Sequence, residues 1–254
     1  MVSSYLTRED VMADATVVVT ADAMARDTRK VTSVTATKRD TSATVMKRDM
    51  SATAMRKVMS TADTRKVTSA TAIRTKVKTS VVILNWNTTG YLEKFVPGIL
   101  KSLEGMDAEL VVADNASTDG SMQMMESKFP DVKRIILDKN YGFTGGYNKA
   151  LAQLDSEYFV LLNSDIEVPE GWLQPLVETL DNNPEVGACA PKLHSWYERN
   201  KFEYAGAAGG FMDSYGYPFC RGRVLHIVEE DRGQYDQPTD ILWATGACLF
   251  IRTQ

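Results

Sequence analysis

From Thr79 onward, short apolar runs alternate with stretches in which apolar residues recur at helical spacing, and this pattern most constrains the fold. Continuous apolar runs of about five residues are typical of strands buried on both faces. The sequence therefore predicts an α/β domain with a mostly parallel sheet and helices on both faces. The predicted strands are 80–84, 109–113, 133–137 and 158–162, and the helices between them are 91–103, 119–128 and 144–154.

Prolines and later apolar runs extend this pattern. Pro169 suits the start of a further helix, and the Asn-Pro pair at 183–184 suits its end. Apolar runs at 186–190 and 241–251 predict two more strands. Pro97 lies inside the first predicted helix, where its ring and its missing N–H predict a kink or a restart.

The first 80 residues differ in composition from the rest. They contain 15 Lys and Arg and 8 Asp and Glu, a net charge of +7, whereas the remainder has 14 and 25, a net charge of −11. All 16 Gly and all 8 Pro follow residue 80. From Arg29 the chain repeats every nine residues, each repeat opening on a basic pair. We predict a repetitive segment over 1–78 and the α/β domain over 79–254.

The repeat leaves two structural interpretations open. Nine residues make about 2.5 helical turns and an odd number of strand positions, so successive repeats would face opposite sides of a helix or a sheet. The segment is therefore either a low-complexity tail or partly helical. Its basic pairs could attract anionic lipid or nucleic acid. Interleaved Asp residues and the lack of aromatic residues favour a solvated extension, so nucleic acid is not an expected partner.

Several protein classes are disfavoured. No apolar run reaches the roughly 18 residues of a membrane span, and the charged residues at 8–10 are not typical of a signal peptide. The cysteines, at 189, 220 and 248, form no C-x-x-C pair, which favours buried thiols and a cytoplasmic location. Neither G-x-G-x-x-G nor a P-loop motif is present. His194 and His226 lie far from the other polar clusters, so we interpret both as structural.

Polar or glycine-rich residues follow each of the first four predicted strands. In a parallel sheet the carboxyl ends of the strands share one edge, where ligands gather. The set suits a nucleotide because it offers an aromatic ring for the base, amides for its edge, small residues near phosphate and a carboxylate for a metal. The candidates are Asn85, Trp86, Asn87, Asp114, Asn115, Gly142, Gly145, Gly146, Asn148, Asn163 and Asp165.

Each candidate also has a purely structural interpretation. Trp86 could be a core aromatic residue, and 114–121 could be a strand-to-helix turn with Ser117 or Thr118 as N-cap. The glycine-rich stretch could be a permissive turn, and Asp165 a loop carboxylate. The order and placement of the candidates together favour the nucleotide site.

Five motifs follow one another in the second region. They are VVILNWN, VVADNASTDGS, NYGFTGGYNKAL, LLNSDIEVPEGWL and ATGACLFIR. In this order and spacing they resemble the family 2 glycosyltransferases of GT-A (Rossmann-like) fold, in particular the rhamnosyltransferase-like members of bacterial surface polysaccharide biosynthesis. The resemblance covers roughly 79–254. It implies inverting, metal-dependent sugar transfer from a dTDP- or UDP-sugar donor to a glycan or lipid-linked acceptor, which is compatible with peripheral association with a membrane.

The resemblance also implies roles for the candidates. Trp86 would lie against the nucleobase, and Asp114 or Asn115 would hydrogen-bond its edge. Asn148 and the stretch 142–146 would line the donor. Asp165 stands at the end of the family's D-x-D motif, whose first Asp is Asn163 here. Asp165 would bind Mg²⁺ or Mn²⁺ between the two phosphates, because these hard cations prefer oxygen ligands.

The resemblance stops before the family's catalytic base. Family members continue past the motif at 244–252 into a Gly-Gly-Phe-Asp segment and an acidic helical motif, neither of which follows here. The acidic cluster at 229–231 does not match that motif. We therefore expect a C-terminally truncated domain that binds donor but is slower in transfer by about 10²–10⁴-fold. The alternatives are a non-catalytic nucleotide-binding or scaffolding protein with the repeat as interaction arm and, less favoured, a nucleotidyltransferase.

Overall fold

The computed structural model describes residues 4–5, 16–20 and 76–253. Residues 79–162 confirm the predicted alternation of strands and helices, and the observed elements begin and end within a few residues of the predicted positions. The nine-residue repeat lies outside the described residues. The elements are β3 (Thr79–Asn85), α3 (Thr89–Ser102), β4 (Ala108–Asp114), α4 (Ser121–Lys128), β5 (Lys133–Ile136), α5 (Gly142–Leu151) and β6 (Tyr158–Leu162).

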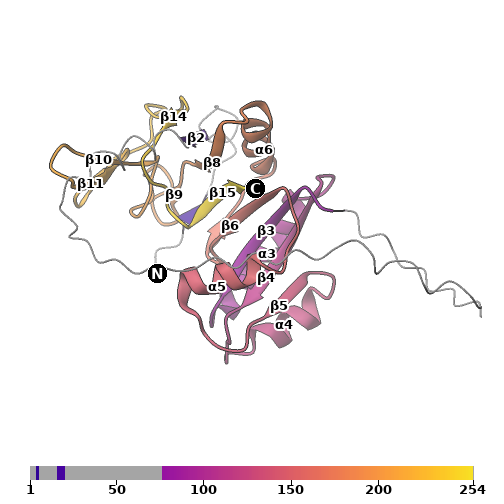
Figure 1. Cartoon of the computed structure of the whole chain (residues 1–254). Helices are drawn as coiled ribbons and strands as arrows, with labels where there is room; N and C mark the ends of the chain where they lie inside the picture. Colours follow the sequence, from indigo (N-terminus) through magenta and orange to yellow (C-terminus); the bar gives the residue numbers. More distant parts are fainter. Residues whose placement is uncertain (1–3, 6–15, 21–75, 254) are drawn as a thin grey trace, which may run out of the picture.

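Strands β6, β3, β4 and β5 lie side by side in that order, all parallel, and we call them the parallel half. Successive side chains of β3 point to opposite faces. Val81 and Ile83 belong to the core cluster that contains the buried face of α3, whereas Val82 packs with Tyr147 of α5. Helix α5 lies in front of the sheet and α3 behind it (Figure 1). The apolar run of β3 thus contributes side chains to two hydrophobic cores, one on each face of the sheet.

Helix α3 runs through Pro97 as one element and does not restart there, contrary to one of the two outcomes predicted for this proline. Pro97 lies on the exposed side of the helix. The buried stripe continues on both sides of it, through Leu92, Phe95 and Ile99. Burial of this stripe against the sheet holds both halves of the helix in line despite the lost backbone hydrogen bond.

Beyond β6 the sheet becomes mixed. Strand β15 (Cys248–Arg252) runs antiparallel between β6 and β8 (Val186–Pro191). The full order is β14-β2-β8-β15-β6-β3-β4-β5, with β2 (Thr16–Thr20) and β14 (Thr239–Asp240) at the far side. Helix α6 (Leu173–Asn182) packs against β8. It begins after Pro169, and Gly171, with a φ of +78°, lies in the turn that precedes it. The α/β class is confirmed, and the sheet is parallel from β6 to β5.

The strand predicted over 241–251 begins only at Cys248. The preceding segment directs its backbone hydrogen bonds elsewhere. The amide of Leu242 donates to the carbonyl of Gly210 at 2.9 Å, and the carbonyl of Trp243 accepts from the amide of Gly210 at 3.0 Å. Backbone pairing with Gly210, the first residue of β10 (Gly210–Met212), therefore prevents residues 241–247 from joining the strand that their apolar character predicts.

Two smaller sheets complete the structure. One contains β7 (Ile166–Glu167), β1 (Ser4–Tyr5) and β9 (His194–Ser195). The other, called the small sheet below, is an antiparallel meander of β10 (Gly210–Met212), β11 (Pro218–Cys220), β12 (Arg223–Val224) and β13 (Ile227–Val228). The three cysteines are buried free thiols, as predicted. Within the described ranges, none of the helices has the length and apolar character needed to cross a bilayer.

Candidate functional site

A cavity of about 380 Å³ opens at the carboxyl ends of β3, β4 and β6. Its volume falls in the range of small-ligand sites. We call it the strand-end pocket. Its wall is formed by Leu84, Trp86, Thr88, Asn115, Asn140, Gly142, Phe143, Asn163, Ser164 and Asp165. Of the residues predicted from sequence, the pocket brings together Trp86, Asn115, Gly142, Asn163 and Asp165.

Asn85 lies behind this wall and ties the ends of β3 and β4 together. Its side chain is fully buried. Its amide nitrogen donates to Asp114 Oδ1 at 2.9 Å, to Ser117 Oγ at 2.9 Å and to Ser121 Oγ at 2.8 Å. The other carboxylate oxygen of Asp114 accepts from the backbone amide of Ser117 at 3.1 Å. Asn85 and Asp114 therefore shape the pocket from behind and do not line it.

Asn87 fixes the turn that presents Trp86. Its φ is +55°, in the left-handed region that Asn tolerates better than most residues. Its backbone amide donates to Ser117 Oγ at 3.0 Å, and its side-chain oxygen accepts from the amide of Thr118 at 2.8 Å. Trp86 is 54% exposed at the pocket wall. The interpretation of Trp86 as a core residue is therefore wrong.

Asn115 connects the end of β4 to the loop before α5. Its amide nitrogen donates to Asn140 Oδ1 at 3.0 Å and to the carbonyl of Gly142 at 3.1 Å. Its side-chain oxygen accepts from the amide of Tyr141 at 2.9 Å. A carbonyl oxygen has two lone pairs, so one acceptor position on Asn115 is left for a ligand.

The glycine-rich stretch is the first part of α5 and not a loop. A side chain at Gly146 would come within 2.8 Å of Leu84, and one at Gly145 within 3.1 Å of Tyr141. These two glycines thus allow close packing of α5, whereas Gly142, with φ of +70°, lines the pocket with Phe143. The amino end of α5, where backbone N–H groups carry partial positive charge, therefore lies at the pocket.

Asp165 is the carboxylate of the pocket wall. It is 8% exposed, and burial raises the pKa of its carboxyl group above the ordinary value. Among the described residues no group of three His, Cys, Asp or Glu could hold a metal by itself. One buried carboxylate beside the hydroxyl of Ser164 and the amide of Asn163 still fits Mg²⁺ or Mn²⁺, because such ions take further oxygen ligands from substrate phosphates.

Asn148 is the one predicted residue for which the structure shows neither a place in the wall nor a supporting contact behind it. It lies on the exposed side of α5 and is absent from the pocket wall. The predicted set therefore divides into five wall residues, five supporting residues (Asn85, Asn87, Asp114, Gly145 and Gly146) and one surface residue.

The sequence prediction did not include Glu203, a second buried carboxylate. Glu203 Oε2 accepts from the backbone amide of Ala205 at 2.7 Å. Burial raises the pKa of Glu203, and the negative charge of Asp165 raises it further. No motif marked this residue, because the fold alone brings the segment after β9 close to Asp165. Leu84 and Thr88 were likewise not predicted, since neither residue type signals a ligand.

The acidic cluster at 229–231 is engaged in internal contacts. Asp231 accepts from Lys192 Nζ at 2.5 Å and lies 2.9 Å from His194 Nε2. Burial alone would raise the pKa of Asp231, but the hydrogen bonds from Lys192 and its neighbours lower it overall. Glu230 pairs with Arg232 at 2.9 Å. These contacts agree with a structural role for His194.

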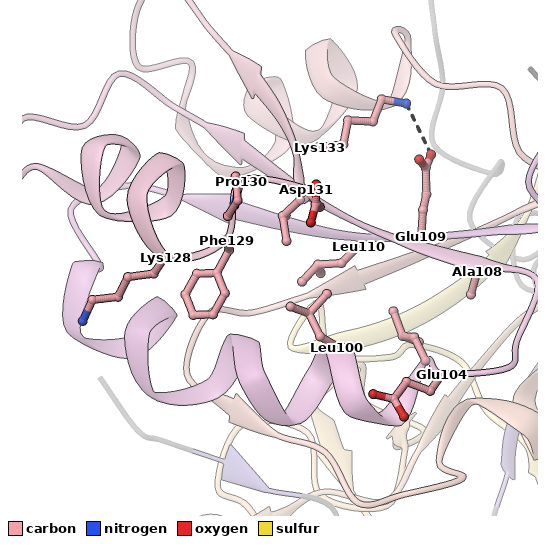
Figure 2. A pocket seen from close by; sticks show the side chains of 12 residues that line it. Leu100, Glu104, Ala108, Glu109, Leu110, Lys128, Phe129, Pro130, Asp131 and Lys133 are labelled. Carbon is pink, nitrogen blue, oxygen red and sulfur yellow. Dashed lines mark hydrogen bonds and ion pairs between the residues drawn. The ribbon is translucent and has the colours of Figure 1, made fainter. Parts of the chain in front are cut away.

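A second cavity, of about 430 Å³, lies at the opposite end of β4 (Figure 2). Apolar residues such as Leu110 and Phe129 form much of its wall. Lys133 is paired with Glu109 at 3.3 Å. Because it lies at the amino end of the strand, this cavity takes no part in the strand-end chemistry.

The fold is an α/β domain with a pocket at the carboxyl ends of its parallel strands. Residues 80–248 match the model of the family described as Glycosyl transferase family 2, and the chain belongs to this family. The family predicted from the sequence is therefore confirmed.

Two curated relatives indicate the range of the family. The N-acetylglucosaminyl-diphospho-decaprenol L-rhamnosyltransferase of Mycobacterium tuberculosis is 22% identical over 187 residues, which cover 68% of this chain and 60% of the relative. The undecaprenyl-phosphate 4-deoxy-4-formamido-L-arabinose transferase of Proteus mirabilis is 27% identical over 60% of this chain and 50% of the relative. The chain thus spans 50–60% of the length of these two relatives.

Among solved structures, a mannosyltransferase from Pyrobaculum calidifontis in complex with GDP-Man and Mn²⁺ is 25% identical. The match covers 44% of this chain and 34% of the mannosyltransferase chain, with a TM-score of 0.39. A superposition of this quality supports no conclusion about the site.

Proposed function

We propose that this domain binds a nucleotide-diphospho-sugar in the strand-end pocket and takes part in the inverting transfer of its sugar to a glycan or lipid-linked acceptor. The observation that carries the proposal is the convergence of an exposed indole, an amide, a helix amino end and a buried carboxylate on one cavity. Membership of glycosyl transferase family 2 supports the same class of reaction.

The nucleobase would stack on Trp86. An exposed indole at a pocket wall offers a flat apolar face, and stacking of a base on an aromatic ring is worth roughly 1–3 kcal/mol. Asn115 lines the pocket and keeps one acceptor position for an N–H group at the base edge, whereas Asp114 lies behind the wall, where Asn85 and Ser117 donate to its carboxylate. Asn115 is therefore the better of the two predicted readers of the base, and uracil and thymine offer the N–H group it needs.

The diphosphate would lie between the amino end of α5 and Asp165. Gly142 and Phe143 bring the first-turn amides of α5 to the pocket, and helix amino ends attract phosphate. Asp165, with Asn163 and Ser164 beside it, would hold Mg²⁺ or Mn²⁺. Such an ion, when bound, neutralises the charge that develops on the departing nucleoside diphosphate.

The acceptor would be lipid-linked. The two curated relatives are named for polyprenyl-linked compounds, decaprenol diphosphate and undecaprenyl phosphate. We do not assign the base that activates the acceptor hydroxyl to the acidic cluster at 229–231, because Asp231 and Glu230 are held in internal contacts.

Calorimetric titration of the whole chain with UDP and dTDP, with and without Mn²⁺, tests the donor site. Trp86→Ala should weaken binding about tenfold or more, since the stacking lost is worth roughly 1–3 kcal/mol and about 1.4 kcal/mol is tenfold. Asp165→Asn should abolish the gain in affinity that Mn²⁺ gives. Ile136→Thr, on the exposed side of β5, is the control for a surface change.

Asn148→Ala tests whether Asn148 contacts the donor, as the sequence predicts, or is a surface residue outside the site. Unchanged affinity would remove Asn148 from the predicted donor site, whereas a tenfold loss would mean that the bound donor extends along α5. Equal affinity of the unaltered chain and Trp86→Ala, or binding that chelation of the metal leaves unchanged, would contradict the proposed site. Donor binding without sugar transfer to a polyprenyl-linked acceptor would favour a nucleotide-binding protein without catalytic activity.

A further inference from the structure

Large apolar side chains face solvent at one end of the small sheet. Since β10 to β13 form an antiparallel meander, the turns 213–217 and 225–226 lie at the same end. Tyr215 is 87% exposed in the first turn and Leu225 is 76% exposed in the second. We call the exposed residues of this end the tip cluster: Met212, Tyr215, Tyr217, Val224, Leu225 and Ile227. Figure 1 shows β10 and β11 at the periphery of the molecule.

The first turn is held rigidly. Asp213 Oδ1 accepts from the backbone amides of Tyr215 at 2.8 Å and Tyr217 at 2.9 Å. The amide of Asp213 donates to the carbonyl of Tyr217 at 3.0 Å, which closes the hairpin. The two tyrosine rings are therefore presented by an ordered turn, and their exposure is a property of the fold.

The second turn carries a residue that its backbone disfavours. Leu225 has a φ of +54°, a left-handed conformation that Gly, Asn and Asp adopt readily and a bulky residue does not. Val224 and Ile227 form the cross-strand pair directly behind it, and both face solvent. A hairpin that served only as a connection would have a polar or glycine turn here. A role as a connection alone therefore does not account for an exposed leucine at this position.

Arg223 and Tyr204 lie just behind the aliphatic tip. The guanidinium of Arg223 donates to the carbonyl of Leu225 at 2.9 Å and stands 4.4 Å from the ring centroid of Tyr204. One carboxylate, Asp213, lies in the first turn, where it accepts the backbone amides of Tyr215 and Tyr217. Glu229, Glu230 and Asp231 follow β13 at the opposite end of the sheet.

We propose that the tip cluster inserts into the interfacial layer of a lipid bilayer. Aliphatic side chains would enter the acyl region, while tyrosine rings and arginine lie at the level of the headgroups, where amphipathic side chains are favoured. Arg223, which lies behind Leu225, would meet lipid phosphate, while Asp213 stays bound to the amides of its own turn. The inference rests on the proposed function, in which the acceptor is a membrane lipid.

The other end of the small sheet is joined to the strand-end pocket. Gly210 pairs with Trp243, and this segment leads through Gly246 to β15. A side chain at Gly246 would lie 2.9 Å from the ring of Phe143, a residue of the pocket wall. Packed residues therefore connect the tip cluster to the donor pocket, so that insertion at one end would hold the pocket near a lipid-linked acceptor.

Co-sedimentation of the whole chain with phosphatidylcholine vesicles, with and without phosphatidylglycerol, tests the proposal. The unaltered chain should bind both kinds of vesicle, because insertion of the apolar tip cluster supplies most of the affinity. Leu225→Asn should weaken binding about tenfold, since the transfer of a leucine side chain is lost. Asn suits the left-handed turn, so the variant should be no less stable, and a loss of binding cannot come from unfolding. Ile136→Thr, an equally exposed apolar residue on β5, should leave vesicle binding unchanged.

Leu225→Trp provides a second measurement. Its emission should shift to shorter wavelength with vesicles and be quenched by brominated lipids. No vesicle binding by the unaltered chain, equal loss in Ile136→Thr, or a dimer that Leu225→Asn converts to a monomer would each overturn the proposal, the last by assigning the surface to a second copy. UDP titration of Leu225→Asn separates the two proposals: intact nucleotide affinity without vesicle binding refutes the docking surface alone, and vesicle binding without nucleotide affinity refutes the donor site alone.

Discussion

In the parallel half, β3 has apolar side chains buried on both faces, whereas in the small sheet most of the large apolar side chains of β10 to β13 face solvent. The two regions also differ in their polar groups. In the parallel half the polar side chains gather at the carboxyl ends of strands and hydrogen-bond one another around Asn85. In the small sheet the buried core is limited to a few residues such as Phe202 and Cys220.

This difference separates two ways of building a functional surface. The parallel half can hold a polar pocket because the burial of two core faces stabilises it independently of the strand ends. The small sheet has little core of its own, so its apolar tips are available for contacts outside the chain.

The largest expected effect is in the parallel half. Ile83→Ala should lower the free energy of unfolding by about 2–5 kcal/mol, because it opens a cavity in a fully buried strand. Ile136→Ala, on an exposed position of the same sheet, should change it by less than about 0.5 kcal/mol. Urea denaturation of both variants measures the difference, and similar losses would mean that β5 is covered in solution.

Alanine substitutions at two glycines test how tightly the core of the small sheet is packed. Gly222 and Gly216 have φ of +86° and +87°, so alanine at either position costs roughly 1–2 kcal/mol of backbone strain. A side chain at Gly222 would also come within 2.5 Å of the Phe202 ring, whereas at Gly216 nothing lies within 4 Å. Gly222→Ala should therefore be less stable than Gly216→Ala by about 1–3 kcal/mol in thermal unfolding. Equal stability would show that Phe202 is free to move.

Asn85 tests whether the polar cluster supports the pocket. Asn85→Ala leaves buried acceptors on Asp114 and Ser121 without a donor, which should cost about 1–3 kcal/mol of stability. Nucleotide affinity should fall with it, since the turn that carries Trp86 loses its anchor. Asn148→Ala, an exposed asparagine of α5, is the matched variant for stability and should not be less stable. A stable Asn85→Ala with full nucleotide affinity would contradict the supporting role.

The smallest expected effect is a dependence on pH. Burial alone would raise the pKa of Asp119, but its hydrogen bonds from Thr89 and Ser121 lower it to about 2. A carboxyl with a lowered pKa in the folded state stabilises the protein above its unfolded pKa of about 4, and this stabilisation is lost as the pH falls towards 2. Asp119→Asn should therefore narrow the difference in melting temperature between pH 5 and pH 3 by roughly a degree or two, since Asp119 is exposed. An unchanged difference would show that other carboxylates dominate acid sensitivity.

Much of the parallel half could be predicted because each of its elements is encoded locally. The runs that became β3, β4 and β6 are mostly apolar, and polar residues stand at their carboxyl ends, so the sequence predicted both the strands and the edge of the site. The segment at 241–247 could not be predicted in this way. It is as apolar as a strand, but its backbone pairs with Gly210, some thirty residues earlier in the chain.

The sequence by itself determined the α/β alternation, the polar strand ends and the motifs by which the family is known, since these depend on residue type and spacing along the chain. Only the tertiary structure decided which candidates reach the pocket. Asn85 and Gly146 belong to the same motifs as Trp86 and Gly142, yet packing against Asp114 and Leu84 turns the first two inward. The outward tips of the small sheet were likewise decided by strand pairing, because a meander brings alternate turns to one end whatever their separation in sequence.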